Sequence, residues 1–279
     1  MSNVGFINGR FMPLEAAMVS VEDRGFQFGD GVYEVIRTYH GIPFLADEHL
    51  IRLDRSAGAI ALTNPFSLRQ WREFIEEGIR LGGYEESKVY IQLTRGTAPR
   101  DHSFPQQTAP TAVMTICAMR PLDQSTRSSG VEVITLNDFR WGRCDIKSLN
   151  LLSNVLARQR AKEAGAFEAI FVREGWITEG AVSNVMVVRD DILVTPQQGE
   201  WILSGVTRTA VLDLARKEGI AVREQNISAG EFRAAEEIFL TGTTVEILAV
   251  VSVDRMRIGS GKPGALTERL SARFSALVG

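Results

Sequence analysis

The sequence predicts an α+β fold that is divided into two domains. Its 279 residues exceed the roughly 100–200 residues of one average domain. The expected strands gather in groups and do not alternate strictly with helices, which favours α+β over a doubly wound sheet. Only residues 120–130, RPLDQSTRSSG, have the composition of a linker. We therefore expect a small N-terminal domain at 1–119, a linker at 120–130 and a larger C-terminal domain at 131–279.

The N-terminal half contains a predicted β-hairpin at residues 30–47, DGVYEVIRTYHGIPFLAD. Tyr33 and Val35 alternate with Glu34, so they share one face of the first strand, and His40-Gly41 supplies the turn. Asp47 is then expected to cap a helix, EHLIRLDRSAGAI.

A second helix is predicted to begin at Ser67, because Gln70 three residues later completes a capping-box pattern. Its apolar residues form one stripe: Trp71, Phe74, Ile75 and Ile79. Gly82-Gly83 ends the helix. Strands at 88–94 and 111–119 then bracket a loop at 95–110, whose Pro and Gly residues exclude regular structure and whose length suggests a function.

The C-terminal half mixes strands and helices. A strand at 131–136 opens it, and helices are expected at 151–165 and 207–219, each ending in glycine. The other expected strands lie at 168–174, 184–188, 192–196 and 237–242.

Composition excludes several functional classes. The 31 basic and 34 acidic residues give a net charge of -3, which would gather neither nucleic acid nor anionic lipid. The longest apolar runs are far shorter than a bilayer span, and the N-terminus lacks the pattern of a targeting signal. The two cysteines, Cys117 and Cys144, lack CxxC spacing and fit a reducing, cytoplasmic location.

Common chemical motifs are also absent. The three histidines lie far apart without metal-ligand spacing, so no metal site is expected. GSGKPG at 259–264 lacks the first glycine and the hydroxyl residue of a phosphate loop and is predicted to be a turn. No GxGxxG or GxSxG motif follows a predicted strand.

Three stretches of the second half resemble one family. CDIKSLN (144–150), WITEGAVSN (176–184) and WILSGVTRTAV (201–211) together resemble the fold-type IV pyridoxal-phosphate enzymes. EDRGFQFGDGVYEV, EHLIRL and RGTAPRDHSFP in the first half look most like D-amino-acid aminotransferase. Met186 departs from the pattern, because the family usually has an aromatic residue there. The resemblance implies a two-domain enzyme with pyridoxal 5'-phosphate at the domain interface.

Lys147 is the expected catalytic residue. From its neighbours alone it is either a surface residue on a half-exposed turn or an amine made nucleophilic by desolvation. The resemblance implies that Lys147 holds the cofactor as a Schiff base and moves the proton of the substrate α-carbon. It also implies that Glu179 meets the pyridine nitrogen and keeps the ring protonated, where the alternative is a turn glutamate before Gly180.

The cofactor phosphate is expected at the start of a helix. Gly205 precedes the predicted helix, so the backbone N–H groups of Val206 and Thr207 can bind an anion, and the alternative is simple capping by Thr207. The resemblance adds Arg52 and the Thr243 hydroxyl as phosphate contacts. An exposed helical arginine and a strand-end turn are the alternatives for these two.

Arg100 and His102 are the expected substrate-binding pair. Residues i and i+2 of an extended chain face the same way, so both can reach one carboxylate. The bland alternative is a solvated loop. By resemblance the pair comes from the neighbouring subunit of a homodimer and, with Tyr33, traps the substrate α-carboxylate.

The sequence thus predicts a pyridoxal-phosphate-dependent transaminase that moves an amino group between a D-amino acid and a 2-oxo acid such as 2-oxoglutarate or pyruvate. An (R)-selective amine transaminase, a branched-chain aminotransferase and a lyase of the same fold are the rivals, and Arg100 with His102 separates the first choice from them. A non-catalytic binding module is the rival of another class. Intact Lys147 and Glu179 argue against it.

Overall fold

The computed structural model describes residues 2–279, which form two compact units. Unit 1 contains the residues up to Arg120 together with Ile146–Asn150, and unit 2 contains Pro121–Asp145 and Leu151–Gly279. The sequence-based domain limits stay a prediction, and two features of the structure differ from them. The short segment Ile146–Asn150 belongs to the first unit, and the expected linker contains helix α4 (Gln124–Ser129).

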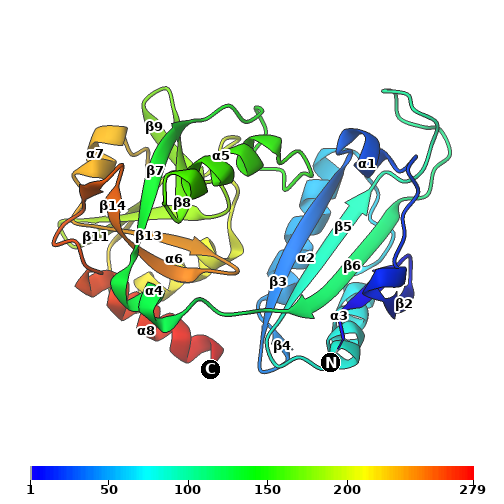
Figure 1. The fold of residues 1–279 in the computed structure, drawn as a ribbon, viewed down its shortest axis with the longest axis horizontal. Coiled ribbons are helices and arrows are strands. Elements are labelled where there is room, and N and C mark those ends of the chain that lie inside the picture. Colours follow the sequence, from blue (N-terminus) through cyan, green and yellow to red (C-terminus); the bar gives the residue numbers. More distant parts are fainter. Residues whose placement is uncertain (1) are drawn as a thin grey trace. The chain divides into compact units, whose positions relative to one another are not determined.

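Unit 1 is built on a six-stranded sheet in the order β2-β1-β6-β5-β3-β4 (Figure 1). All neighbouring strands are antiparallel. The strands are β1 (Val4–Ile7), β2 (Arg10–Pro13), β3 (Gly31–Tyr39), β4 (Ile42–Pro43), β5 (Ser87–Thr94) and β6 (Thr111–Ala118). The predicted hairpin is confirmed, because His40 and Gly41 both have positive φ (52° and 77°) between β3 and β4, as a tight hairpin turn requires.

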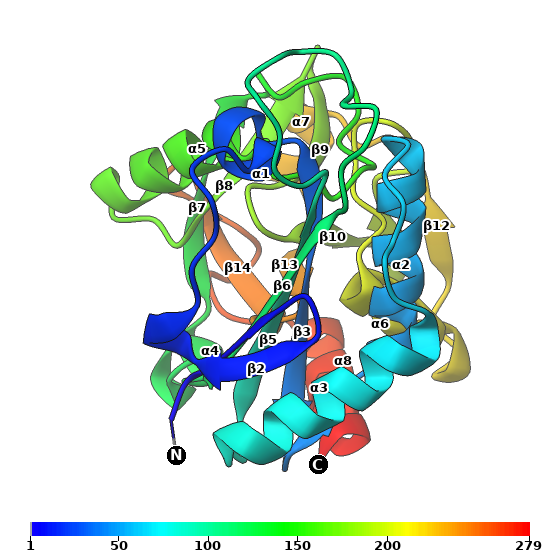
Figure 2. The same ribbon diagram turned by 90° about the vertical axis from the view of Figure 1, so that its right-hand side faces the viewer.

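Helices α2 (Ala46–Ala59) and α3 (Leu68–Gly82) cover one face of this sheet (Figure 2), while η1 (Leu14–Ala16) and α1 (Arg24–Phe28) are short. The predicted capping box of Ser67 and Gln70 is confirmed, and Gly83 ends α3 in the left-handed conformation. The predicted cap by Asp47 is wrong. Helix α2 already begins at Ala46, after Leu45 in the left-handed conformation, so Asp47 lies inside the first turn and pairs with Arg72 instead.

The period-2 pattern of β3 separates two faces of the sheet. Val32 and Ile36 are fully buried in the core beneath the helices, whereas Tyr33 and Val35 are half-buried on the opposite face. The predicted shared face of Tyr33 and Val35 is therefore confirmed. Glu34 lies on the core side with Val32 and Ile36, and its side chain is fully buried.

Unit 2 contains a nine-stranded mixed sheet with the path β12-β11-β10-β13-β14-β7-β8-β9, and β15 pairs with β14. The strands are β7 (Val131–Asn137), β8 (Glu168–Arg173), β9 (Trp176–Gly180), β10 (Asn184–Arg189), β11 (Ile192–Thr195), β12 (Val222–Glu224), β13 (Glu237–Gly242), β14 (Glu246–Val253) and β15 (Met256–Arg257). Its helices besides α4 are α5 (Leu152–Glu163), α6 (Val206–Lys217), α7 (Ala229–Arg233) and α8 (Ala265–Val278). The predicted α+β class is confirmed.

Within residues 2–279 there is no helix with both the length and the apolar character needed to cross a membrane.

Candidate active site

The segment that carries Lys147 runs beside the start of β3. The Tyr33 N–H donates to the Lys147 carbonyl (2.9 Å), and the Leu149 N–H donates to the Gly31 carbonyl (3.0 Å). The Lys147 N–H donates to the Ser56 hydroxyl of α2 (3.2 Å). Ile146 enters the core of unit 1. Hydrogen bonds to β3 on one side and to α2 on the other therefore fix the backbone of Lys147 and the position of its Cα atom.

The Lys147 amine lies over the ring of Tyr33, 4.2 Å from the ring centroid. The π face of the ring attracts a cation. Across the strand, Tyr90 packs 5.7 Å from Tyr33, and burial and the nearby Tyr33 raise the pKa of Tyr90 to about 12, so it stays neutral. No ion pair among the described residues involves Lys147. Its amine is thus oriented by a ring and is not neutralised by a carboxylate.

Arg52, expected to contact a phosphate, is part of a buried cluster with Glu34 and His49. Arg52 Nε donates to Glu34 Oε1 (2.6 Å) and Nη2 donates to Oε2 (2.9 Å). His49 Nδ1 lies 2.8 Å from Glu34 Oε2. All three side chains are buried. The burial of Arg52 thus rules out the alternative interpretation of this residue as an exposed helical arginine.

The charges in this cluster follow from its hydrogen bonds. Burial alone would raise the pKa of Glu34, but the charge and hydrogen bonds of Arg52, helped by His49, hold that pKa well below its usual value. Burial lowers the pKa of His49, so its ring is neutral at pH 7. An ionised carboxylate only accepts, so His49 Nδ1 carries the proton and the contact of 3.5 Å between Nδ1 and Arg52 Nη2 is no hydrogen bond. The cluster as a whole has no net charge.

Arg100 and His102 lie in the irregular segment between β5 and β6, and both are exposed. The Arg100 guanidinium lies 4.3 Å from the centre of the Phe28 ring, and the His102 ring lies 5.2 Å from the same ring. The two expected partners thus share one aromatic contact. Among the described contacts of the chain, none joins Tyr33 to this pair.

In unit 2, Glu179 is buried at the end of β9 and is surrounded by donors. Arg140 Nη1 contacts Oε1, while Asn184 Nδ2 (3.1 Å) and the Leu203 N–H (3.0 Å) donate to Oε2. Hydrogen bonds to the charged form stabilise a carboxylate. Glu179 is therefore held ionised and in one orientation, which excludes the alternative of an ordinary turn glutamate.

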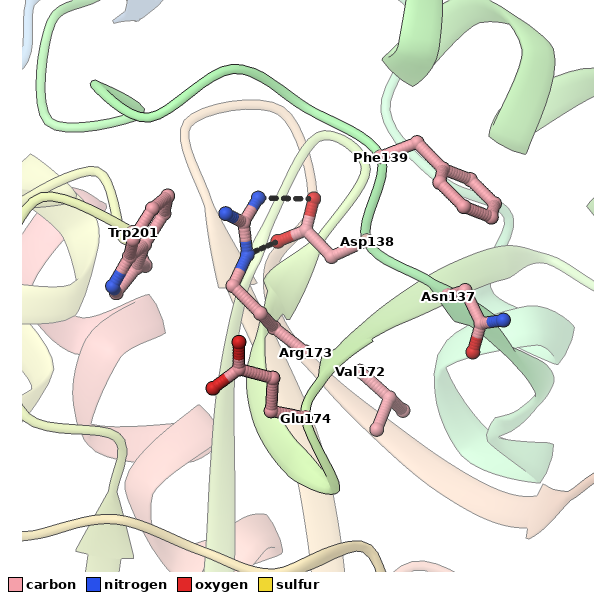
Figure 3. Close-up of a pocket in the computed structure, with 7 residues that line it drawn as sticks. All are labelled: Asn137, Asp138, Phe139, Val172, Arg173, Glu174 and Trp201. Atoms are coloured by element: carbon pink, nitrogen blue, oxygen red, sulfur yellow. Dashed lines mark hydrogen bonds and ion pairs between the residues drawn. The ribbon is translucent and has the colours of Figure 1, made fainter.

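Arg140 is itself held by Asp138, whose two oxygens accept from Nε and Nη2 at 2.9 Å each. Burial would lower the pKa of Arg140, yet the bonds to Asp138 and the charge of Glu179 raise it further above its ordinary value. Arg173 pairs with the same Asp138 (3.2 Å) and lies 3.8 Å from the Trp201 ring. Asp138, Arg173 and Trp201 line an open pocket of about 470 Å³ (Figure 3).

The start of α6 is the candidate phosphate site. Gly205 is its N-cap and offers no side-chain cap, and the N–H groups of the first turn have no partner within a helix. Val206 and Thr207 are the first two helical residues, so Thr207 is not the capping residue. A Cβ at Gly205 would lie 2.0 Å from Asn184 Oδ1, which explains the glycine. Asn184 also donates to the Leu203 carbonyl (3.0 Å) and so ties Glu179 to this turn.

Thr243 lies in the turn between β13 and β14 and is half-buried. The preceding Gly242 approaches the loop after Glu179, because a Cβ there would lie 3.6 Å from the Val182 carbonyl oxygen. Within unit 2, Asn184 on β10 also pairs with Thr241 of β13. Strands β10 and β13 are thus neighbours, and they place Thr243 near the loop after Glu179 and near the turn before α6.

Sequence reasoning missed several members of these clusters, namely Glu34, His49, Asp138, Arg140 and Asn184. Glu34 had a signal, because an acidic residue between Val32 and Ile36 stands on the apolar side of an alternating strand. Asn184 ends the quoted stretch WITEGAVSN. Arg140 and Asp138 follow a strand without any periodic pattern. Among residues 2–279 no group of three His, Cys, Asp or Glu side chains could hold a metal ion.

Comparison with known proteins identifies the family. Residues 31–253 match the family model described as amino-transferase class IV. A D-alanine aminotransferase of Bacillus licheniformis is 44% identical over 268 residues, covering 94% of this chain and 93% of that protein.

Two solved structures are similar over almost the whole chain. The branched-chain amino acid aminotransferase of Escherichia coli superposes with a TM-score of 0.93 at 28% identity, covering 100% of this chain and 95% of that one. A second branched-chain amino acid aminotransferase, solved with pyridoxamine 5'-phosphate, gives a TM-score of 0.91 at 28% identity, covering 100% of this chain and 94% of that one. The chain belongs to the class IV aminotransferase family.

Replacing Glu34 by Gln is expected to destabilise the protein by about 3–5 kcal/mol, because the buried Arg52 guanidinium loses its carboxylate. Urea unfolding measures the change. Asp47→Asn is the matched control, since Asp47 and its partner Arg72 are both about half exposed and such pairs contribute about 0–1 kcal/mol. Equal losses in the two variants would contradict the buried pairing.

The depressed pKa of His49 predicts a pH dependence of stability. The unfolded chain takes up the proton near the ordinary pKa of 6.5, before the folded state does, so the free energy of unfolding falls as the pH drops through that value. We expect His49→Asn, which keeps a donor near Glu34, to flatten this dependence between about pH 7.5 and 5.5. His40→Asn, in the exposed turn, should keep the wild-type slope. An unchanged slope in His49→Asn would refute the assignment.

Proposed function

We propose that this protein is a pyridoxal-phosphate-dependent D-amino-acid aminotransferase. The observation that carries the proposal is Lys147, whose backbone is fixed between β3 and α2 and whose amine lies over Tyr33 without a carboxylate partner among the described residues. Membership of the class IV family supports aminotransferase chemistry. The pyridoxamine 5'-phosphate named for the second branched-chain structure supports the cofactor.

The residues present fit this cofactor. When bound, pyridoxal phosphate supplies an aldehyde for the amino group and a ring that takes up electrons from the substrate α-carbon. Lys147 would hold the cofactor through its amine and move the α-proton at Nζ. The Glu179 carboxylate, held by Asn184 and the Leu203 N–H, would accept a hydrogen bond from the protonated ring nitrogen and keep that nitrogen charged.

The phosphate would bind chiefly at the start of α6. The N–H groups of Val206 and Thr207 and the positive end of the helix dipole suit a dianion, and Gly205 leaves them uncapped. Arg52 and Thr243 remain proposed contacts. Glu34 neutralises the charge of Arg52, so this pair would contribute hydrogen-bond donors to the phosphate and little net positive charge. The helix end therefore supplies most of the attractive field.

Arg100, His102 and Tyr33 are proposed to bind the substrate α-carboxylate. The contact of Arg100 and His102 with one ring, Phe28, supports their joint action on a single anion. The D-alanine aminotransferase relative, at 44% identity, supports a D-amino acid as donor and a 2-oxo acid as acceptor. The branched-chain enzymes, similar in structure at 28% identity, support branched-chain transamination as the second candidate.

We further propose a homodimer, in which the Arg100–His102 pair serves the neighbouring subunit, and a cytoplasmic location. The absence of direct contact between this pair and Tyr33 among the described residues supports the first proposal. The free thiols of Cys117 and Cys144 support the second, because a reducing compartment keeps thiols unpaired.

Lys147→Ala is expected to fold, because the side chain is only half-buried, and to lose steady-state transamination of D-alanine with 2-oxoglutarate. Borohydride treatment of the loaded wild-type enzyme should attach the cofactor to the peptide that contains Lys147, as peptide mass spectrometry would detect. Lys88→Ala, at an exposed position of β5, should behave like the wild type. Wild-type turnover by Lys147→Ala would end the proposal.

Arg100→Ala is expected to separate the carboxylate-binding role from the amine transaminase alternative. Losing one partner of a charged contact costs about 2–5 kcal/mol, or roughly 30- to 5,000-fold in rate. We expect that loss for D-alanine and a much smaller one for (R)-1-phenylethylamine, which has no carboxylate. Each donor must be followed in a single half-reaction, through the decay of the cofactor's visible absorbance, because the acceptor is also a carboxylate.

Arg69→Ala is the control for this measurement, since the Arg69 side chain is 88% exposed on α3. Equal losses for both donors would assign Arg100 to support of its loop. No loss for either donor would make it a solvated residue.

A further inference from the structure

The irregular segment at 95–110 is anchored by a buried arginine outside it. Arg24 is only 3% exposed, at the start of α1. Its Nη1 donates to the Asp101 carbonyl and its Nη2 to the His102 carbonyl (3.4 Å). Asp101 is the residue between Arg100 and His102. One guanidinium therefore holds the backbone at the centre of the proposed substrate-binding pair.

A single carboxylate, Asp30, connects this contact to the start of the segment. Asp30 Oδ2 accepts from Arg24 Nε (2.8 Å) and from Arg95 Nε (2.8 Å), and Oδ1 accepts from Arg95 Nη2 (3.0 Å). Burial would raise the pKa of Asp30, but the hydrogen bonds and charges of Arg95 and Arg24 lower it, so the carboxylate stays ionised.

Arg95 extends the anchor to the end of α2 and to the far part of the loop. It donates to the Ile60 carbonyl (2.8 Å) and to the Ala61 carbonyl (3.0 Å). The Arg95 guanidinium also lies 3.6 Å from the centre of the Phe104 ring. The loop is thus held at its first residue, at its centre and at Phe104 by groups that share Asp30.

Phe28 contacts the side chains of the Arg100–His102 pair. Its ring lies 4.9 Å from the Arg24 guanidinium, 4.3 Å from that of Arg100 and 5.2 Å from the His102 ring. Arg100 Nη1 also donates to the Gln27 carbonyl (3.3 Å) of the same short helix. Arg24 thus orders the backbone of the pair, while Phe28 orders its side chains.

We propose that Arg24 and Phe28 are positioning residues that set Arg100 and His102 for the substrate carboxylate and so determine the preference for carboxylate-bearing donors. The inference rests on the proposed function. Neither residue needs to touch the substrate. A lysine at position 24 keeps the charge beside Asp30, but it has no planar fork to reach two carbonyls at once. A leucine at position 28 keeps apolar bulk and removes the ring that orients Arg100.

The test uses the enzyme loaded with pyridoxal phosphate and the variants Arg24→Lys and Phe28→Leu. For each we expect the D-alanine half-reaction to fall at least about tenfold, with the (R)-1-phenylethylamine half-reaction within about twofold of the wild type. Hydrogen–deuterium exchange should be faster in the 97–104 peptide and unchanged in the α3 peptide. Arg72→Lys, the same substitution at an exposed ion pair with Asp47, is the control and should alter neither readout.

Equal losses for the two donors, or wild-type exchange with a wild-type D-alanine rate, would overturn the inference. If Arg24→Lys does not fold, Phe28→Leu decides alone. Arg100→Ala, measured in parallel, separates the two levels of the proposal. A selective loss in Arg100→Ala without one in either positioning variant overturns this inference only. A non-selective loss in Arg100→Ala overturns the carboxylate site and this inference with it.

Discussion

A buried charge is costly unless an opposite charge and hydrogen bonds accompany it, and both units of this protein are organised around that constraint. Glu34 lies among the core residues of unit 1 because Arg52 and His49 satisfy its two oxygens. In the same way, Asp30 accepts hydrogen bonds from the buried Arg24 and Arg95, and Asp138 accepts them from Arg140. Removing any one of these carboxylates would leave a desolvated guanidinium, so each cluster resists change as a unit.

Because these clusters pair their buried charges, a polar group that has no such partner points to where a ligand could bind. Lys147 has a fixed backbone, but its amine faces a tyrosine ring and is not neutralised by an acid. The first turn of α6 has no side-chain cap, as is also true of α2, α4, α5 and α8, but its N-cap Gly205 lies against Asn184, which also donates to Glu179. An amine without a carboxylate partner and the N–H groups of a helix start suit the phosphorylated aldehyde cofactor that we propose.

The two carboxylates Glu34 and Glu179 show how position decides the role of the same side chain. Glu34 is enclosed by Arg52 and His49, both of which are buried, so its function is to hold those groups in place. Glu179 stands at the end of a strand, where Arg140, Asn184 and a backbone N–H orient it. The donors around Glu179 keep it charged and aligned, which a partner for a protonated ring nitrogen needs.

Local patterns in the sequence determined much of the fold. The hairpin around His40-Gly41, the capping box of Ser67 and Gln70 and the helix and strand sites of the second half follow from interactions within a few residues. Asp47 shows the limit, because α2 begins after the left-handed Leu45, two residues earlier than the capping rule predicts. The short strands β12 and β15 and the five-residue helix α1 carry too few residues for a periodic signal. The apolar run in β14 does not distinguish strand from helix by itself.

The resemblance of the motifs named Lys147 and Glu179 as candidates, and the predicted helix start after Gly205 named Val206 and Thr207. The contacts around these residues came only from the tertiary structure. Arg24 meets the carbonyl of Asp101 across 77 positions of sequence, and Arg140 meets Glu179 across 39. Sequence alone determined most of the local elements, which depend on near neighbours, and it named the candidate site residues. Tertiary structure decided which charges are paired and which amine is not, because a pair between distant positions forms only after the chain has folded and excluded water from both.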